Sequence, residues 1–242
     1  LTATGKIIGG NNNTANGADA AVLGGFSNKA CGNYSNVAGG YDNVACGNFS
    51  NVAGGNSNLA NGANAAVLGG FINQAIGTCS NVAGGEVNTA CGNNSNVAGG
   101  SNNCANGNNS NVAGGFSNCS IGIFSNVAGG GSNTASGGFS NVAGGNNNTA
   151  NGAGAAVLGG DANRACGTVS NVAGGCFNTA IGTCSNVAGG YNNVACGINS
   201  AILGGTTNTI LSAHTDSFII GSNLTSSASA TTFVNNLTAQ GT

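Results

Sequence analysis

Small apolar and polar residues alternate along this chain in a pattern that repeats every 15 residues. The unit at 43–55 reads Asn-Val-Ala-Cys-Gly-Asn-Phe-Ser-Asn-Val-Ala-Gly-Gly, and the constant positions of each half, 43–47 and 50–54, lie two residues apart. Period-two alternation is typical of β-strands, and no stretch shows the 3.6-residue spacing of an amphipathic helix. We therefore expect two short strands per repeat, each of about five residues.

Glycine marks the boundaries of these half-units. Gly pairs recur from 9–10 to 204–205 without a slip, and a single Gly recurs between them from Gly17 to Gly197. We expect these glycines to occupy turns that need a positive φ. Stacking of about fourteen such units predicts an all-β parallel β-solenoid, or β-roll, over residues 1–205. Residues 206–242 lose the Gly pairs and are expected to form a last irregular coil and a C-terminal cap or exit segment.

The constant columns are expected to face the interior, because stacked copies fix the available volume there. In the first half these columns hold Asn43, Ala45 and Gly47, and in the second half the residues at 50, 52 and 54. Stacked Asn amides can hydrogen-bond to the copies above and below. We interpret this column as a structural ladder that stabilises a corner of the coil and binds no ligand: Asn13, Asn28, Asn43, Asn58, Asn73 and Asn88.

The outward columns of the second half hold mostly Asn and Ala, with Asn36, Asn51 and Asn81 as examples. In four coils this pair becomes Ala and Leu. Loss of a polar Asn together with gain of a Leu indicates a face that meets a partner. Drift between near-identical repeat copies stays open as the alternative. The candidate interface leucines lie on a three-coil spacing from which one member is missing, because Ala113 occupies its place: Leu23, Leu68, Leu158 and Leu203.

Charge is nearly absent. Only 3% of the residues are charged and the net charge is −2, whereas an ordinary soluble domain is about 25% charged. Three Lys and Arg residues form no basic patch, so we expect no nucleic-acid partner. No apolar run approaches the roughly 18 residues of a membrane span, so we expect no membrane insertion.

The chain lacks the residues of an active site. His214 is its only histidine, and Asp216 is the one acid near it in the sequence. The remaining acids lie in different coils, no phosphate-binding glycine motif is present, and no Asp repeats as in calcium-binding solenoids. We therefore expect no enzyme activity, no cofactor and no metal site.

The ten cysteines indicate, weakly, an oxidising compartment. Cys31 and Cys46 share an outward column in adjacent coils, as do Cys104 and Cys119. Strand spacing places such pairs within the Cα–Cα window for disulfides, about 4.4–6.8 Å. These two pairs are the candidate disulfides, and we expect an extracellular or surface-exposed location on a cell, spore or virion.

The half-units Asn-x-Ala-x-Gly and Ser-Asn-Val-Ala-Gly resemble the left-handed parallel β-roll of trimeric autotransporter adhesin heads. They are also similar to the ryegrass-type antifreeze β-roll, and residues 217–223 and 232–237 resemble the last coil and exit segment of bacterial, phage and giant-virus fibre proteins. The resemblance implies a left-handed solenoid that acts as a scaffold. The outward Asn and Ala columns depart from the Val and Ile that form the trimer core of adhesin heads, which argues against that trimer.

Together these observations predict a non-catalytic structural or adhesive module of an extracellular fibre or surface. Its expected partner is itself, in a homo-oligomer or filament formed laterally or end to end, with a host or particle surface as a further candidate. The alternative, from a different functional class, is an ice-binding solenoid that uses its flat Asn/Ala/Gly face.

Overall fold

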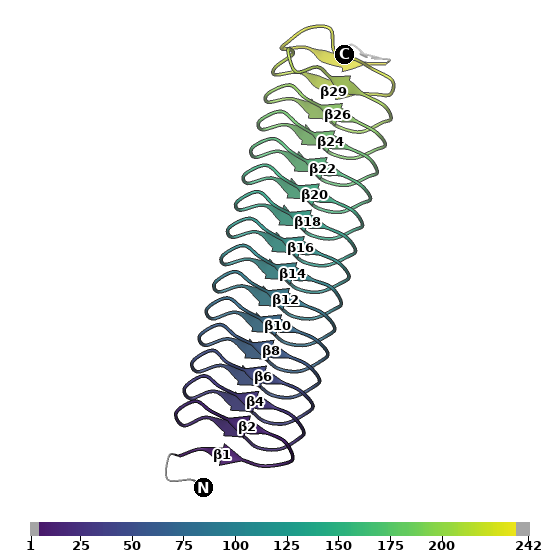
Figure 1. Cartoon of the computed structure of the whole chain (residues 1–242). Coiled ribbons are helices and arrows are strands. Elements are labelled where there is room, and N and C mark those ends of the chain that lie inside the picture. Colours follow the sequence, from purple (N-terminus) through teal and green to yellow (C-terminus); the bar gives the residue numbers. More distant parts are fainter. Residues whose placement is uncertain (1–4, 236–242) are drawn as a thin grey trace, which may run out of the picture. The chain divides into compact units, whose positions relative to one another are not determined.

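The computed structural model describes residues 5–235 and divides the chain into two compact units, Leu1–Gly129 and Gly130–Thr242. Each unit is a parallel β-solenoid with two short strands per coil, and no helix occurs in the described residues (Figure 1). The chain has about 15 turns, one more than the sequence predicts. The predicted all-β β-solenoid class is therefore confirmed.

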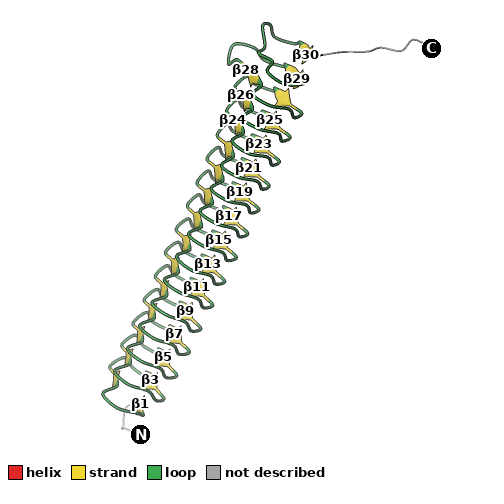
Figure 2. Cartoon of the chain, turned by 90° about the vertical axis from the view of Figure 1, so that its right-hand side faces the viewer, coloured by secondary structure: helices red, strands yellow, loops and turns green. Residues whose placement is uncertain are grey.

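Successive strands alternate between two sheets, here named sheet 1 and sheet 2, on opposite sides of each coil (Figure 2). Within each unit, neighbouring strands of a sheet are parallel, and Asn81, for example, pairs with Asn96. In the first unit, sheet 1 consists of β1 (Ile7–Ile8), β3 (Ala21–Val22), β5 (Asn36–Val37), β7 (Asn51–Val52), β9 (Ala66–Val67), β11 (Asn81–Val82), β13 (Asn96–Val97), β15 (Asn111–Val112) and β17 (Asn126–Val127). Sheet 2 consists of β2 (Thr14–Ala15), β4 (Lys29–Ala30), β6 (Val44–Ala45), β8 (Leu59–Ala60), β10 (Gln74–Ala75), β12 (Thr89–Ala90), β14 (Cys104–Ala105) and β16 (Cys119–Ser120).

The second unit repeats this arrangement and ends in two longer strands. Its sheet 2 consists of β18 (Thr134–Ala135), β20 (Thr149–Ala150), β22 (Arg164–Ala165), β24 (Thr179–Ala180), β26 (Val194–Ala195) and β28 (Thr209–Ile210). Its sheet 1 consists of β19 (Asn141–Val142), β21 (Ala156–Val157), β23 (Asn171–Val172), β25 (Asn186–Val187), β27 (Ala201–Ile202), β29 (Phe218–Ile220) and β30 (Thr232–Val234).

The regular strands are two residues long, so the expected length of five is wrong. The reason is visible where β6 ends. The Ala60 carbonyl accepts from both Cys46 N–H, at 2.9 Å, and Gly47 N–H, at 3.3 Å. One carbonyl that serves two successive donors shows that the chain has already left the extended conformation at Gly47.

The three constant glycines of a coil have three different roles. The second Gly of each pair has a positive φ, 89° at Gly55, as expected. The single Gly, such as Gly62, has no positive φ, but a Cβ there would overlap the carbonyl oxygen of Gly77. The first Gly of the pair, such as Gly54, is half-exposed, and a Cβ there would meet nothing within 4 Å. The interior position predicted for residue 54 is therefore wrong, and so is a positive φ for the single Gly.

The remaining left-handed turn positions of the regular coils are held by residues other than glycine, apart from Gly154. Tyr34 and Phe49, which occupy the same turn position in adjacent coils, have φ of 57° and 59°. Ser27, in the turn that follows the Gly pair, has φ of 56°. Such a conformation costs a non-glycine residue roughly 1–2 kcal/mol. These turns persist because the backbone bonds of adjacent coils hold them, as in Phe49 N–H to Asn33 O at 2.8 Å.

The interior is thin and contains polar columns beside the Ala and Val columns. Ala45, Val52 and Asn43 are all completely buried. The Asn column is a ladder, as predicted, but its amides bond mainly to the backbone and not to one another. Asn43 Oδ1 accepts from Asn58 N–H at 3.0 Å, and Asn43 Nδ2 donates to Gly39 O at 3.0 Å and Gly55 O at 2.9 Å. Each Asn thus joins three backbone groups at the corner of the coil.

The buried serine column contains hydroxyls in two states, and this difference gives a testable prediction. Ser95 Oγ donates to Gly92 O at 2.6 Å, whereas the buried Ser50 Oγ has no partner. Because an unpaired buried hydroxyl costs about 1–3 kcal/mol, we expect Ser50→Ala to raise the thermal midpoint and Ser95→Ala to lower it, each by roughly 1 kcal/mol of stability. Parallel melts followed by circular dichroism compare the two variants, and shifts in the same direction would contradict this account.

The regular register ends after Gly205, as the sequence predicts. Ala201 pairs with Phe218 and Thr209 with Thr225, in place of residues 15 positions further on. In this irregular coil Ile219 is buried, and β30 adds the last strand of sheet 1 on β29. The final part of the predicted cap or exit segment, 236–242, lies outside the described residues.

Candidate functional site

In residues 5–235 no pocket is found, and no group of three or more His, Cys, Asp or Glu side chains is placed to hold a metal ion. His214 and Asp216 do not pair with each other in the described bonds: His214 Nδ1 lies 2.7 Å from Ser226 Oγ, and Asp216 Oδ1 accepts from Asn199 Nδ2 at 3.1 Å. Over the same residues, no helix has the length and apolar character of a membrane span. Candidate functional side chains are therefore found on the outer surface.

The outward Asn residues of sheet 1 form rows of linked amides. Asn81 Nδ2 donates to Asn96 Oδ1 at 3.1 Å, and Asn96 Nδ2 donates to Asn111 Oδ1 at 2.9 Å. Asn36 and Asn51 are linked in the same way, at 3.3 Å. These half-buried amides use their hydrogen-bonding groups within the row. The amide stacking expected for the interior Asn column is thus found on this face.

Each row stops where a Leu coil begins. The four candidate interface leucines project from sheet 1, with 55% of Leu23, 51% of Leu68, 51% of Leu158 and 52% of Leu203 exposed. At the neighbouring outward position these coils carry Ala, so no amide continues the row. One consequence is seen at Asn36, whose Oδ1 is buried without a partner beside Ala21. The face therefore alternates between rows of linked amides and projecting apolar side chains.

The Leu coils differ from the others at more positions than the column comparison revealed. Alongside Leu, three of them carry Ala in the turn, at the buried Ser position and at the outward Asn position. The co-occurrence marks these coils as a distinct coil type. Comparison of whole coils, in place of single columns, would have found it in the sequence: Ala18, Ala20 and Ala21; Ala63, Ala65 and Ala66; Ala153, Ala155 and Ala156.

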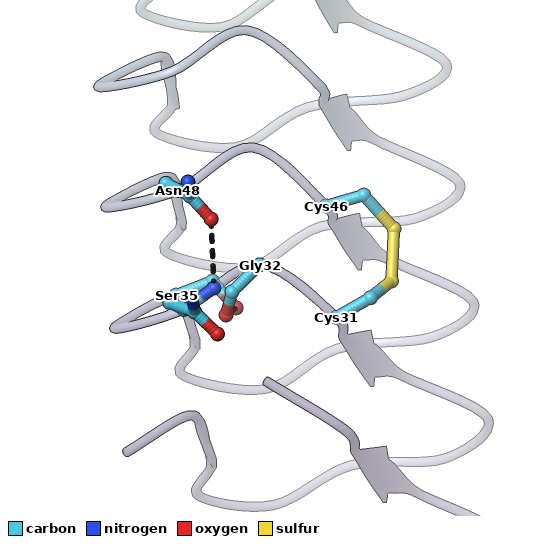
Figure 3. Close-up of a disulfide and its surroundings, with 6 residues drawn as sticks. Cys31, Gly32, Ser35, Cys46 and Asn48 are labelled. Carbon is cyan, nitrogen blue, oxygen red and sulfur yellow. Dashed lines mark hydrogen bonds between the residues drawn. A yellow bond between two sulfur atoms is a disulfide. The ribbon is translucent and has the colours of Figure 1, made fainter. Parts of the chain in front are cut away.

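Sheet 2 carries a disulfide on its outer side, between Cys31 and Cys46 (Figure 3). The Cα atoms are 4.5 Å apart. This candidate disulfide is confirmed, and closing a 15-residue loop contributes about 3 kcal/mol in the chain-entropy account. Figure 3 also shows Asn48 in the adjacent turn, whose Oδ1 accepts from Asn33 N–H at 3.0 Å.

The second candidate pair, Cys104 and Cys119, is present as two thiols. The two residues are register partners on β14 and β16, and both side chains are half-buried. A hydrogen bond between the two thiols lowers the pKa of Cys119 to about 7 against the opposing effect of burial. The same bond, followed by burial, raises the pKa of Cys104. The structure brings the predicted residues together but leaves their disulfide unformed.

Two pairs of stacked aromatic rings lie at the turns, and the sequence analysis did not single them out. Tyr34 and Phe49 stack with ring centroids 4.9 Å apart, and Phe26 and Tyr41 stack at 5.6 Å. All four side chains are exposed. Their signal in the sequence was the occurrence of aromatic residues in one column of adjacent coils.

No protein-family model matches the chain, and no curated protein matches its sequence. The solenoid fold therefore rests on the structure, and the resemblance to adhesin heads, fibre proteins and antifreeze β-rolls stays a prediction.

Proposed function

We propose that the protein is a non-catalytic structural or adhesive module of an extracellular fibre or surface, and that its copies associate laterally through sheet 1. The observation that carries this proposal is the projection of half-exposed leucines from a sheet whose amides are already paired with one another. Burial of such a face removes apolar area from water and leaves few polar groups without partners.

The face is complementary to a second copy of itself. In the first unit, Leu23 and Leu68 are separated by two coils that carry Ala38 and Ala53 in the same column. A leucine of one copy would fill the space over these alanines in the other, as residues of an isologous interface do. The outward columns of sheet 1 contain no charged side chain in the described strands, so no like charges meet. A second copy is therefore the occupant that this surface fits best.

Two further observations support a location outside the cytosol. Cys31 and Cys46 form a disulfide, and structural disulfides persist in oxidising compartments. Within each unit, backbone bonds link successive coils, as in Asn51 N–H to Ala65 O at 2.9 Å and Ala53 N–H to Val67 O at 3.0 Å. A continuous network of this kind suits a mechanical or display role, because local opening must break several bonds at once.

Removal of the four leucines tests the association. The variant with Leu→Ala at 23, 68, 158 and 203 receives the residue that other coils already carry in this column. We expect the wild-type chain to self-associate and the variant to raise the dissociation constant at least about 100-fold, because each truncation removes buried apolar area. Sedimentation equilibrium, before and after reduction, measures this change independently of intermolecular disulfides.

The matched control is Leu59→Ala, which removes an outward leucine from sheet 2. We expect this variant to associate like the wild-type chain. A wild-type protein that stays monomeric over the concentration range, or a fourfold variant that associates normally, would overturn the proposal. Unchanged circular dichroism would show that the variants keep their fold.

Ice binding by the Asn/Ala/Gly face stays a prediction of the sequence and is not our preferred function. The evenly spaced Asn and Ala columns favour it, but Leu23 and Leu68 project from this face and interrupt its flatness. Thermal hysteresis at high micromolar concentration would support ice binding, and its absence would exclude a strong activity of this kind.

A further inference from the structure

The thiols of Cys104 and Cys119 lie side by side on the outer face of sheet 2. Their residues pair directly in the register of β14 and β16. Cys31 and Cys46 also lie in adjacent coils of sheet 2, in the next outward column, directly after β4 and β6. Their Cα atoms are 4.5 Å apart, and a disulfide joins them. Because parallel strands keep a constant spacing, Cys104 and Cys119 are placed for the same bond.

The two thiols are not equivalent. The hydrogen bond between them favours a proton on Cys104 and a thiolate on Cys119, so the pKa of Cys104 is raised and that of Cys119 is lowered to about 7. Asn106 Oδ1, 3.0 Å from Cys104 Sγ, is a second acceptor for the proton of Cys104. This asymmetry separates a nucleophile from its partner, as in dithiols that exchange with disulfides.

Few other titratable groups act on the pair. Cys91, an exposed thiol that follows β12 on the adjacent strand, raises the pKa of Cys119 through charge repulsion. The three basic residues of the chain, Lys6, Lys29 and Arg164, lie in other coils. The activation of Cys119 therefore comes from Cys104 itself and not from a neighbouring cation.

We propose that Cys104 and Cys119 form a thiol–disulfide exchange site whose substrates are accessible disulfides, with Cys119 as the nucleophile and Cys104 as the resolving residue. The Cys119 thiolate attacks one sulfur of a disulfide RSSR, forms a mixed disulfide and releases RS⁻. Cys104 gives its proton to this RS⁻ and attacks Cys119 Sγ, which forms the Cys104–Cys119 disulfide and releases a second RS⁻ that takes a proton from water. Two protein thiols are oxidised and RSSR is reduced to two RSH. This chemistry does not depend on the lateral association proposed above.

Trapping of the mixed disulfide tests the assignment. The reduced full-length chain is exposed to oxidised glutathione, and the products are mapped by peptide mass spectrometry. We expect the wild-type chain to form the Cys104–Cys119 disulfide with no lasting adduct at either residue, and Cys104→Ala to retain glutathione on Cys119. At pH 6 we expect Cys119 to react about fivefold faster than a thiol of ordinary pKa, since its larger thiolate fraction outweighs its lower intrinsic nucleophilicity.

Two controls separate this site from ordinary surface thiols. Cys166→Ala removes a half-buried thiol that has no cysteine in the same column of the adjacent coils, and it should leave the wild-type products unchanged. In Cys119→Ala, glutathione should add to Cys104 more slowly than the wild-type chain forms its Cys104–Cys119 disulfide, because the variant lacks the thiol whose pKa is lowered. A lasting adduct on Cys119 in the wild-type chain, or equal rates in the wild-type chain and Cys119→Ala, would overturn the proposal. Matched circular dichroism melts report whether each variant is folded.

Discussion

Substitution of Gly62 by alanine is expected to disrupt the stacking of the coils around it. A Cβ at this buried position would overlap the carbonyl oxygen of Gly77, which belongs to the backbone of the next coil and cannot rotate away. The coil spacing is fixed by bonds such as Asn61 N–H to Ala75 O at 2.8 Å, so relief of the overlap must lengthen them. Overpacking against backbone, with loss of such bonds, is expected to cost about 3 kcal/mol or more.

Gly69→Ala is the matched control for this experiment. A Cβ on Gly69 would meet nothing within 4 Å, and its φ is not positive, so we expect a change within roughly 0.5 kcal/mol. Because long repeat arrays do not always unfold in one step, the thermal midpoint should be combined with hydrogen exchange of the peptides that cover residues 57–80. Equal protection in both variants would show that the close approach of the coils does not require glycine.

Substitution of Asn73 by alanine is expected to have the second largest effect. The fully buried Asn73 side chain accepts from Asn88 N–H at 3.0 Å and donates to Gly69 O and Gly85 O, each at 2.9 Å. Gly85 O keeps a bond from Phe71 N–H, but the described bonds give Asn88 N–H and Gly69 O no replacement. Since a buried group left unpaired costs about 1–3 kcal/mol, we expect a loss of roughly 3 kcal/mol, measured by the thermal midpoint and by faster exchange of the Asn88 amide.

Asn81→Ala provides the comparison for Asn73→Ala. Asn81 lies on the outer face of sheet 1, and its side chain bonds to Asn96 Oδ1 at 3.1 Å. The preceding coil already has Ala66 at this position, so the fold accepts the substitution and we expect a change of about 0.5 kcal/mol or less. Similar losses for Asn73→Ala and Asn81→Ala would mean that the interior ladder is no more important than the outer row.

Much of the fold could be predicted from the repeat because a solenoid is governed by nearest-neighbour contacts. A 15-residue period with alternation at spacing two was enough to predict parallel strands, a buried Val52 and two candidate disulfides, of which the one between Cys31 and Cys46 is formed. The Leu coils were also identifiable, because they differ from their neighbours in composition. Their exposure was correctly inferred from the alternation, and what binds them stays a proposal.

By itself, the sequence determined the fold class, the two strands per coil, the buried columns of Asn, Ala and Val, and the outward position of the leucines. Tertiary structure alone decided which glycines are needed, because Gly54 and Gly62 are equally constant in the repeat and only the position of the next coil distinguishes them. It also decided that the buried Asn amides bond to the backbone while the outward amides bond to one another. Finally, it gave Cys104 and Cys119 different acidities. Each of these outcomes depends on distances between adjacent coils, and a column of identical letters does not contain those distances.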